Sequence, residues 1–116
     1  MVGDYVADKP PDPLCKLARS ESVRVRRAAI AATWHFIRHG KLDDTFTIAE
    51  LLVDDPEHLV RTAVGGWVRE AGKRDRGRLR AFLDAHAATM PRTTLRYAIE
   101  HLDADERRRY RTLSKT

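Results

Sequence analysis

The sequence predicts an all-α protein, a solenoid of three helix pairs followed by a C-terminal capping helix. The main observation is a five-residue pattern, aliphatic-Arg-x-Ala-aliphatic, which recurs every 35 residues at 25–29, 60–64 and 95–99. A fixed period of this size is typical of solenoids, in which each unit buries its apolar face against its neighbours. Proline, glycine and aspartate separate segments with helical periodicity, and there is little strand signal.

The whole chain, residues 1–116, is predicted to form one domain, because this is a usual domain length. The repeats are expected at about 11–39, 43–73 and 75–102, and the cap at 103–113. A content of 42% hydrophobic and 34% charged residues excludes a disordered chain, and no apolar run is long enough to span a membrane. The absence of a signal-peptide pattern, together with a single cysteine expected to be packed, Cys15, favours a cytoplasmic protein.

The first repeat is predicted to begin with a short amphipathic helix at residues 13–18. Ser20 or Ser22 then caps a longer helix that runs to about Arg38, and Gly40 ends it. Only a proline-rich connector and a short stub precede this repeat. The N-terminal end therefore lacks a good cap, and we expect its exposed solenoid face to allow pairing with a second copy of the chain.

The second repeat is predicted to open at Asp43 or Asp44 with a helix that ends at about residue 53. Pro56 suits the first position of the partner helix, which runs to about Lys73.

The third repeat is predicted to open at Asp75, and its partner helix runs from about residue 91 to about Leu102. Asp103 caps the last helix, and Glu106 stands three residues later, as in a capping box. The run of charges at 106–109 is expected to be a solvated face.

A basic stripe is predicted on one side of each long helix. At 100° per residue, Val25, Ala29, Ala32 and Phe36 fall together on the buried side of the first. Neighbouring stripes of a solenoid align, so they should form one concave strip. The residues expected to bind DNA on it are Arg24, Arg27, His35, Arg38, Arg69, Lys73, Arg92 and Arg96.

The net charge of +5, carried almost entirely by arginine, favours a phosphate-bearing partner, because the guanidinium fork bonds two oxygens at once. A soluble surface with many ion pairs is an equally good interpretation of charge alone. The arginines at the fixed repeat positions, Arg26 and Arg61, are expected to be structural ion-pair partners between units.

Gly65 and Gly66 are adjacent inside a predicted helix, where each glycine lowers helix stability by about 1 kcal/mol relative to alanine. We therefore expect a structural or functional role for this pair. They serve either close helix packing or a flat patch that lets a bulky backbone such as DNA approach. Trp34 and Trp67 are expected to pack in the core, although Trp34 lies beside the basic stripe and could reach it.

Motifs for metal and cofactor chemistry are absent. There is no HExxH sequence, no paired-cysteine motif and no phosphate-binding glycine loop. His35 and His39 are four residues apart, but no third ligand is evident. We therefore expect neither a metal nor a cofactor.

Three blocks of this sequence, at 18–38, 63–75 and 90–100, resemble the DNA alkylation repair enzymes, the AlkD-like HEAT-repeat DNA glycosylases. The order and spacing of all three blocks agree with that family, and the similarity spans nearly the whole chain. It covers only the C-terminal half of a typical member. The resemblance implies a HEAT-like superhelix whose concave face holds double-stranded DNA, including alkylated DNA, in the cytoplasm and near the nucleoid.

The resemblance also implies an activity, excision of cationic N3- and N7-alkylpurines by cleavage of the N-glycosidic bond. The family's arginine matches Arg69, which would be the catalytic residue here, and its paired arginines match Arg26 and Arg27. Its tryptophan falls at Arg24 and its catalytic aspartate at Ala28, so both are missing. Whether the chain is an enzyme is left open, and the alternative is a catalytically inactive protein-interaction scaffold.

Overall fold

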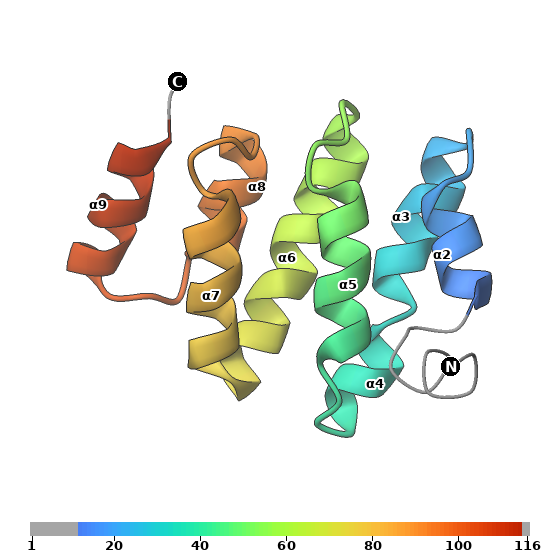
Figure 1. Ribbon diagram of the computed structural model, residues 1–116, viewed down its shortest axis with the longest axis horizontal. Coiled ribbons are helices and arrows are strands. Elements are labelled where there is room, and N and C mark those ends of the chain that lie inside the picture. The colour runs from blue at the N-terminus through green and yellow to red at the C-terminus, as the bar shows by residue number, and fades with distance from the viewer. Residues whose placement is uncertain (1–11, 115–116) are drawn as a thin grey trace, which may run out of the picture.

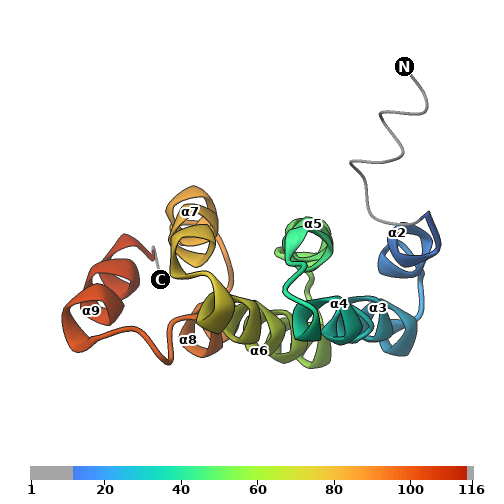
Figure 2. The same cartoon turned by 90° about the horizontal axis from the view of Figure 1, so that it is seen from below.

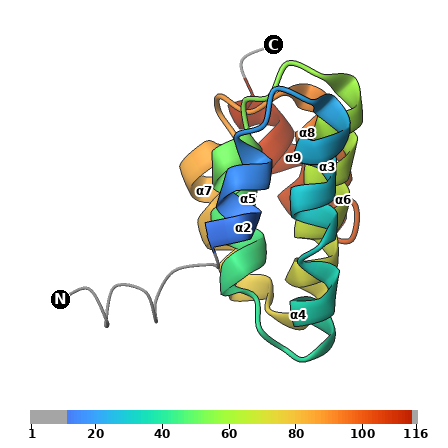
Figure 3. The same ribbon diagram turned by 90° about the vertical axis from the view of Figure 1, so that its right-hand side faces the viewer.

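The computed structural model describes residues 12–114, and every regular element in that part of the chain is an α-helix. The helices stand side by side in two layers (Figures 1 and 2). Figure 3 shows the layers end-on, with α2, α5 and α7 in one and α3, α4, α6 and α8 in the other. The elements are α2 (Asp12–Ala18), α3 (Val23–Ala31), α4 (Trp34–Arg38), α5 (Asp43–Leu52), α6 (His58–Arg74), α7 (Arg76–His86), α8 (Arg92–Ala98) and α9 (Ala104–Leu113).

This architecture confirms the all-α prediction and is compatible with an α-solenoid, with α9 at the C-terminal end (Figure 1). The division into repeats and the HEAT-like arrangement stay predictions. The two layers meet over a continuous apolar core, to which the apolar stripes of successive helices contribute. Within residues 12–114, no helix is long and apolar enough to cross a membrane. The largest fully buried side chains include Ile30, Ile37, Ile48, Val60, Val64, Val68, Leu83, Leu95, Ile99, Leu102 and Tyr110.

The single helix expected from Ser22 to Arg38 is wrong, because the chain bends between α3 and α4 at Thr33. Ser22 does cap α3, accepting from the amide of Val25. The Thr33 side chain is fully buried, and its hydroxyl donates to the carbonyl of Ile30 at 2.7 Å. A hydroxyl bonded to the preceding turn tightens and bends a helix at that point.

The bend also rotates the buried side of this segment. Ala32 was predicted to be buried and is exposed, while Val25 and Phe36 are only half-buried. The fully buried positions are Ala29, Ile30, Thr33 and Ile37. The core stripe therefore follows Ile30 and Ile37 rather than the predicted line.

Arg26 joins the first helix pair to the second, as predicted from its repeat position. Its Nε donates to Asp55 Oδ2 at 2.6 Å and its Nη2 to Oδ1 at 3.3 Å, which makes a two-pronged bond to a buried carboxylate. This hydrogen bond raises the pKa of Arg26 above its ordinary value. The same carboxylate accepts from the amide of Glu57 at 3.0 Å, so α6 begins at His58 and the prediction that Pro56 opens the helix is wrong.

Arg61 occupies the equivalent position but makes no ion pair between units within the described residues, so that prediction is wrong. Its Nε donates at 2.7 Å to the backbone carbonyl of Asp55, inside its own pair. The second joint depends instead on Gly65, where α6 and α8 approach closely. A Cβ at Gly65 would lie 2.6 Å from the carbonyl oxygen of Thr94 and 2.7 Å from Tyr97 Cβ.

The third pair is shorter than predicted, because α8 ends at Ala98 and not near Leu102. Ile99 and Leu102 are both buried, and turn hydrogen bonds such as Leu102 N–H to the Ile99 carbonyl at 3.0 Å bring both into the core. Asp75 caps α7 as expected, accepting from the amide of Arg78 at 3.1 Å.

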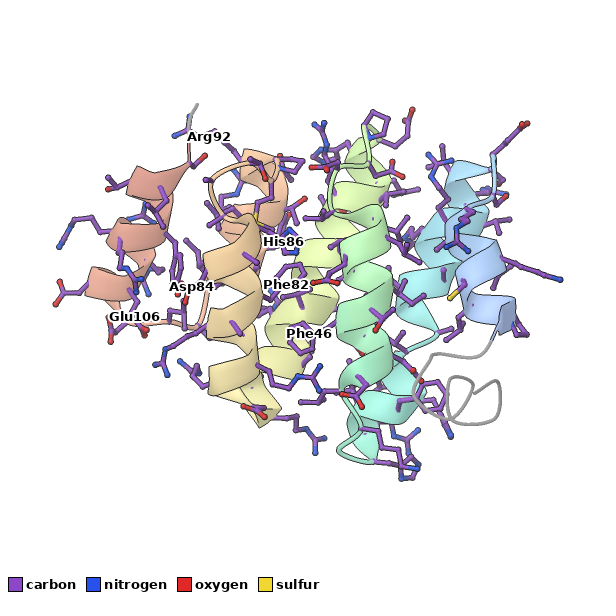
Figure 4. All side chains as sticks on the ribbon, in the orientation of Figure 1. Phe46, Phe82, Asp84, His86, Arg92 and Glu106 are labelled. Atoms are coloured by element: carbon purple, nitrogen blue, oxygen red, sulfur yellow. The ribbon has the colours of Figure 1, made fainter. Side chains whose placement is uncertain are left out.

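The last helix, α9, is docked on α7 through polar and aromatic contacts. Asp103 caps it as predicted, but the capping box does not form, because the Glu106 carboxylate pairs with Arg80 at 2.6 Å. Tyr110 is fully buried and donates to Asp84 at 2.8 Å. Figure 4 shows Asp84 and Glu106 at this α7–α9 contact. The expectation that residues 106–109 form a solvated face is therefore wrong for Glu106.

Candidate functional site

The outer side of the α3–α4–α6–α8 layer carries exposed cations, and we call it the arginine face. The α3–α4–α6–α8 layer faces the α2–α5–α7 layer (Figure 2), and the inner side of its helices packs on the core between them, so their exposed residues point away from that core. Seven of the eight residues predicted to bind DNA are exposed, and the eighth, Arg69, is half-buried. The exposed seven are Arg24, Arg27, His35, Arg38, Lys73, Arg92 and Arg96.

The α3–α4 arginines of this face are not neutralised within the protein. Among the described residues, no carboxylate forms an ion pair with Arg24, Arg27 or Arg38. The structural arginines differ from them, since Arg26 and Arg80 each hold a carboxylate. Cations without internal partners are available to an external anion, and their charges add to one positive field.

Arg69, the strongest single candidate from the sequence, is placed differently from these arginines. Its Nε lies 3.2 Å from Glu70 Oε2, and its Nη1 lies 2.5 Å from Glu100 Oε1. Glu70 also pairs with Lys73 at 3.3 Å. The charge of Arg69 is thus offset by two carboxylates for which the sequence pattern predicts no role. The only signal was that Glu70 follows Arg69 and Glu100 shares the helix face of Arg96.

Trp34 is not in the core, so that prediction is wrong. It is 43% exposed, and its ring packs on Trp67, with centroids 5.5 Å apart and an interplanar angle of 38°. The guanidinium of Arg38 lies 5.9 Å from the centre of the Trp34 ring. Trp67 is half-buried and packs against the core, as predicted. Because the chain bends at Thr33, Trp34 is the first residue of α4. Sequence periodicity alone does not reveal this bend.

The two consecutive glycines of α6 have different roles, and each of the two sequence interpretations fits one of them. Gly65 allows α6 and α8 to pack, whereas a Cβ on Gly66 would meet nothing within 4 Å. Gly66 therefore leaves an open patch of backbone on the arginine face. It forms part of a shallow depression of about 310 Å³, lined by Trp34, Gly66, Trp67, Arg69 and Glu70.

The remaining predicted residues lie toward the two ends of the face. His35 is exposed, and its ring lies 5.0 Å from that of His39. In the part of the chain that the structure describes, no group of three potential ligands could hold a metal ion. Arg92 and Arg96 lie on α8 near α9, at the C-terminal end of the face.

The two positions at which the resemblance places catalytic residues are on α3. Ala28 and Arg24 are both exposed there. Helix α3 therefore contributes no carboxylate at the position where the enzymes that this sequence resembles have an aspartate. Of the residues that line the depression, Glu70 is the one with a carboxylate. The arrangement as a whole offers cations, an exposed indole and bare backbone, which suit an extended polyanion with aromatic rings.

A sequence model of the family described as DNA alkylation repair enzyme matches residues 1–102. None of the curated proteins and none of the solved structures matches the chain. The matched region ends before α9, so the arginine face lies inside it and the C-terminal helix outside it.

Proposed function

The chain belongs to the DNA alkylation repair enzyme family, and from this premise we propose that it binds double-stranded DNA through the arginine face. The family implies an interaction with DNA. The observation that carries the proposal is the set of α3–α4 arginines, Arg24, Arg27 and Arg38, without a carboxylate partner among the described residues. The proposal includes a cytoplasmic, nucleoid-associated location.

The shape of the face supports contact with a phosphate backbone. Since Gly66 presents no side chain, the surface beside Trp34 is open to a bulky polymer. Arg38 of α4 lies over Trp34, which lines this opening, and Lys73 lies in the last turn of α6. Contacts from Arg27 and Arg38 to phosphates would fix the position of the duplex, and they would carry no sequence preference.

The salt dependence of binding tests this proposal. Each phosphate neutralised contributes a slope of about −0.9 to the plot of log affinity against log salt concentration. The double variant Arg27→Gln/Arg38→Gln should therefore bind duplex DNA more weakly and lower that slope by about 2. Fluorescence anisotropy of a labelled duplex at several salt concentrations measures both quantities.

The matched control is Arg108→Gln, which removes an exposed arginine from α9, away from the face. It should change neither affinity nor slope. An unchanged slope in the double variant would contradict the proposal, as would an equal loss of affinity in the control.

A second candidate function is excision of cationic alkylpurines, favoured by Glu70 in the depression. A cationic base is a good leaving group: the C1′–N bond breaks, its electron pair neutralises the base, and water adds to C1′ and releases its proton to solvent. A carboxylate can stabilise the positive charge on the sugar and orient that water. Glu70 is half-buried beside Trp34, and Arg69 and Lys73 hold its carboxylate in place.

Release of free alkylpurine from methylated duplex DNA tests excision. We expect release by the native chain, and a loss of about 100-fold in Glu70→Gln, as for other charge-stabilising groups. Glu100→Gln is the control, because it removes the other carboxylate of Arg69 but does not line the depression. No release above background by the native chain rules out this second function and leaves DNA binding intact.

The alternative to DNA binding is a protein-interaction scaffold. Leu59, which is 44% exposed near the start of α6, would be one apolar contact for such a partner. Such a scaffold would bind a protein partner with little salt dependence and would show no affinity for the duplex.

A further inference from the structure

A cavity at the contact of α8 and α9 lies at the C-terminal end of the arginine face, where two arginines of that face meet residues of α9, and the functions above assign it no ligand. It has a volume of about 290 Å³ and is lined by Arg92, Leu95, Arg96, Arg111 and Ser114. Arg92 and Arg96 come from α8, while Arg111 comes from the last turn of α9. Figure 4 shows Arg92 at the end of α8 that faces the C-terminal end of α9.

The charge of this cavity is uncompensated. Over residues 12–114, no ion pair involves Arg92, Arg96 or Arg111, although most arginines of α7 and α9 hold a carboxylate or a carbonyl. Three arginine side chains line one small space, so their like charges repel each other, and a bound anion would relieve that repulsion. Among the described residues that line the cavity, none carries a side-chain carboxylate to do so.

The arginines of the cavity are carried by well-packed elements. Leu95, which forms part of the wall, is 2% exposed, and the guanidinium of Arg96 lies 5.6 Å from the ring centre of Tyr97. Across the cavity, α9 is anchored by the buried Tyr110, which donates to Asp84. The α8 and α9 walls are therefore held in position before any ligand binds, which lowers the entropy cost of binding.

We propose that this cavity binds a phosphate group. Guanidinium forks match the oxygens of a phosphate, and several of them suit its double negative charge better than the single charge of a carboxylate. Ser114 offers a hydroxyl at the rim. The site depends on Arg111 and Ser114, which follow the region matched by the family, so it is not implied by family membership. It also does not depend on DNA binding by the arginine face.

Inorganic phosphate is the probe for the site, titrated against the full chain and followed by isothermal calorimetry and by NMR of the arginine side chains. Arg111→Gln should weaken phosphate binding by about tenfold or more, the effect of losing one charge-assisted hydrogen bond. Arg108→Gln is the matched control, since it removes the same charge from the same helix but pairs with Asp105 outside the cavity. It should leave phosphate binding unchanged.

Two duplexes of one sequence, with and without a 5′-phosphate, identify the source of the phosphate. If Arg111→Gln weakens binding of only the phosphorylated duplex, the site takes a terminal phosphate. If it weakens binding of both duplexes equally, the site takes a backbone phosphate. If phosphate binding falls and both duplexes are unaffected, the site takes a small phosphate ester. Failure of the native chain to bind phosphate would overturn the proposal, and so would equal losses in Arg111→Gln and Arg108→Gln. Neither result touches the salt slope predicted for the arginine face.

Discussion

Gly65→Ala is expected to lower the free energy of unfolding by about 2 kcal/mol. The added Cβ would lie 2.6 Å from the Thr94 carbonyl oxygen, which belongs to the backbone of α8 and cannot rotate away. Overpacking of this kind costs about 1–3 kcal/mol, and a contact with backbone belongs at the upper end. The better helix propensity of alanine offsets about 1 kcal/mol of that cost.

Gly66→Ala is the matched variant, and it is expected to raise the free energy of unfolding. Its Cβ would meet nothing within 4 Å, so only the gain in helix propensity remains, about 1 kcal/mol. Urea unfolding followed by circular dichroism measures both changes. If the two alanine variants had the same stability, the close approach of α6 and α8 would not be the reason for Gly65.

Tyr110→Ala is expected to have the largest effect on stability, about 3–5 kcal/mol. Tyr110 is fully buried between α9 and the rest of the core, and removal of such an aromatic side chain leaves a large cavity. Because α9 is held mainly by this ring and by the Arg80–Glu106 pair, its backbone amides should lose protection from hydrogen exchange before those of α6.

Tyr110→Phe separates packing from hydrogen bonding. It keeps the ring and loses only the bond to Asp84, whose side chain is 54% exposed and can turn to water. We expect a loss of about 1 kcal/mol and no change in the relative protection of α9. A phenylalanine variant as unstable as the alanine variant would show that the hydrogen bond, and not the ring, anchors the helix.

Much of the fold could be predicted from the sequence, because it follows from local patterns. These patterns can be read from short stretches of chain: the period of 35 residues, the apolar spacing and the caps at Ser22, Asp75 and Asp103. Arg26 could also be assigned a structural role from its fixed repeat position, although its partner Asp55, 29 residues away, could not be named from that pattern.

The candidate site could be predicted only in outline, because its details depend on contacts between distant residues. Helical periodicity cannot foresee that the Thr33 hydroxyl bends the helix and thereby exposes Trp34. It also cannot foresee that Arg69 meets Glu100, 31 residues away in sequence. Seven of the eight residues assigned to the basic stripe are nevertheless exposed, since long arginine side chains tolerate small rotations of a helix, and their role in binding stays a prediction.

The glycine at the α6–α8 joint also limits how this chain could have arisen from copies of one unit. The repeat period places Ile30 of the first pair in register with Gly65 of the second, and both are buried. A duplicated first unit set in the second place would bring an isoleucine against the Thr94 backbone, where even a methyl group does not fit. The units therefore cannot be exchanged for one another, because each one packs well only in its own place in the chain.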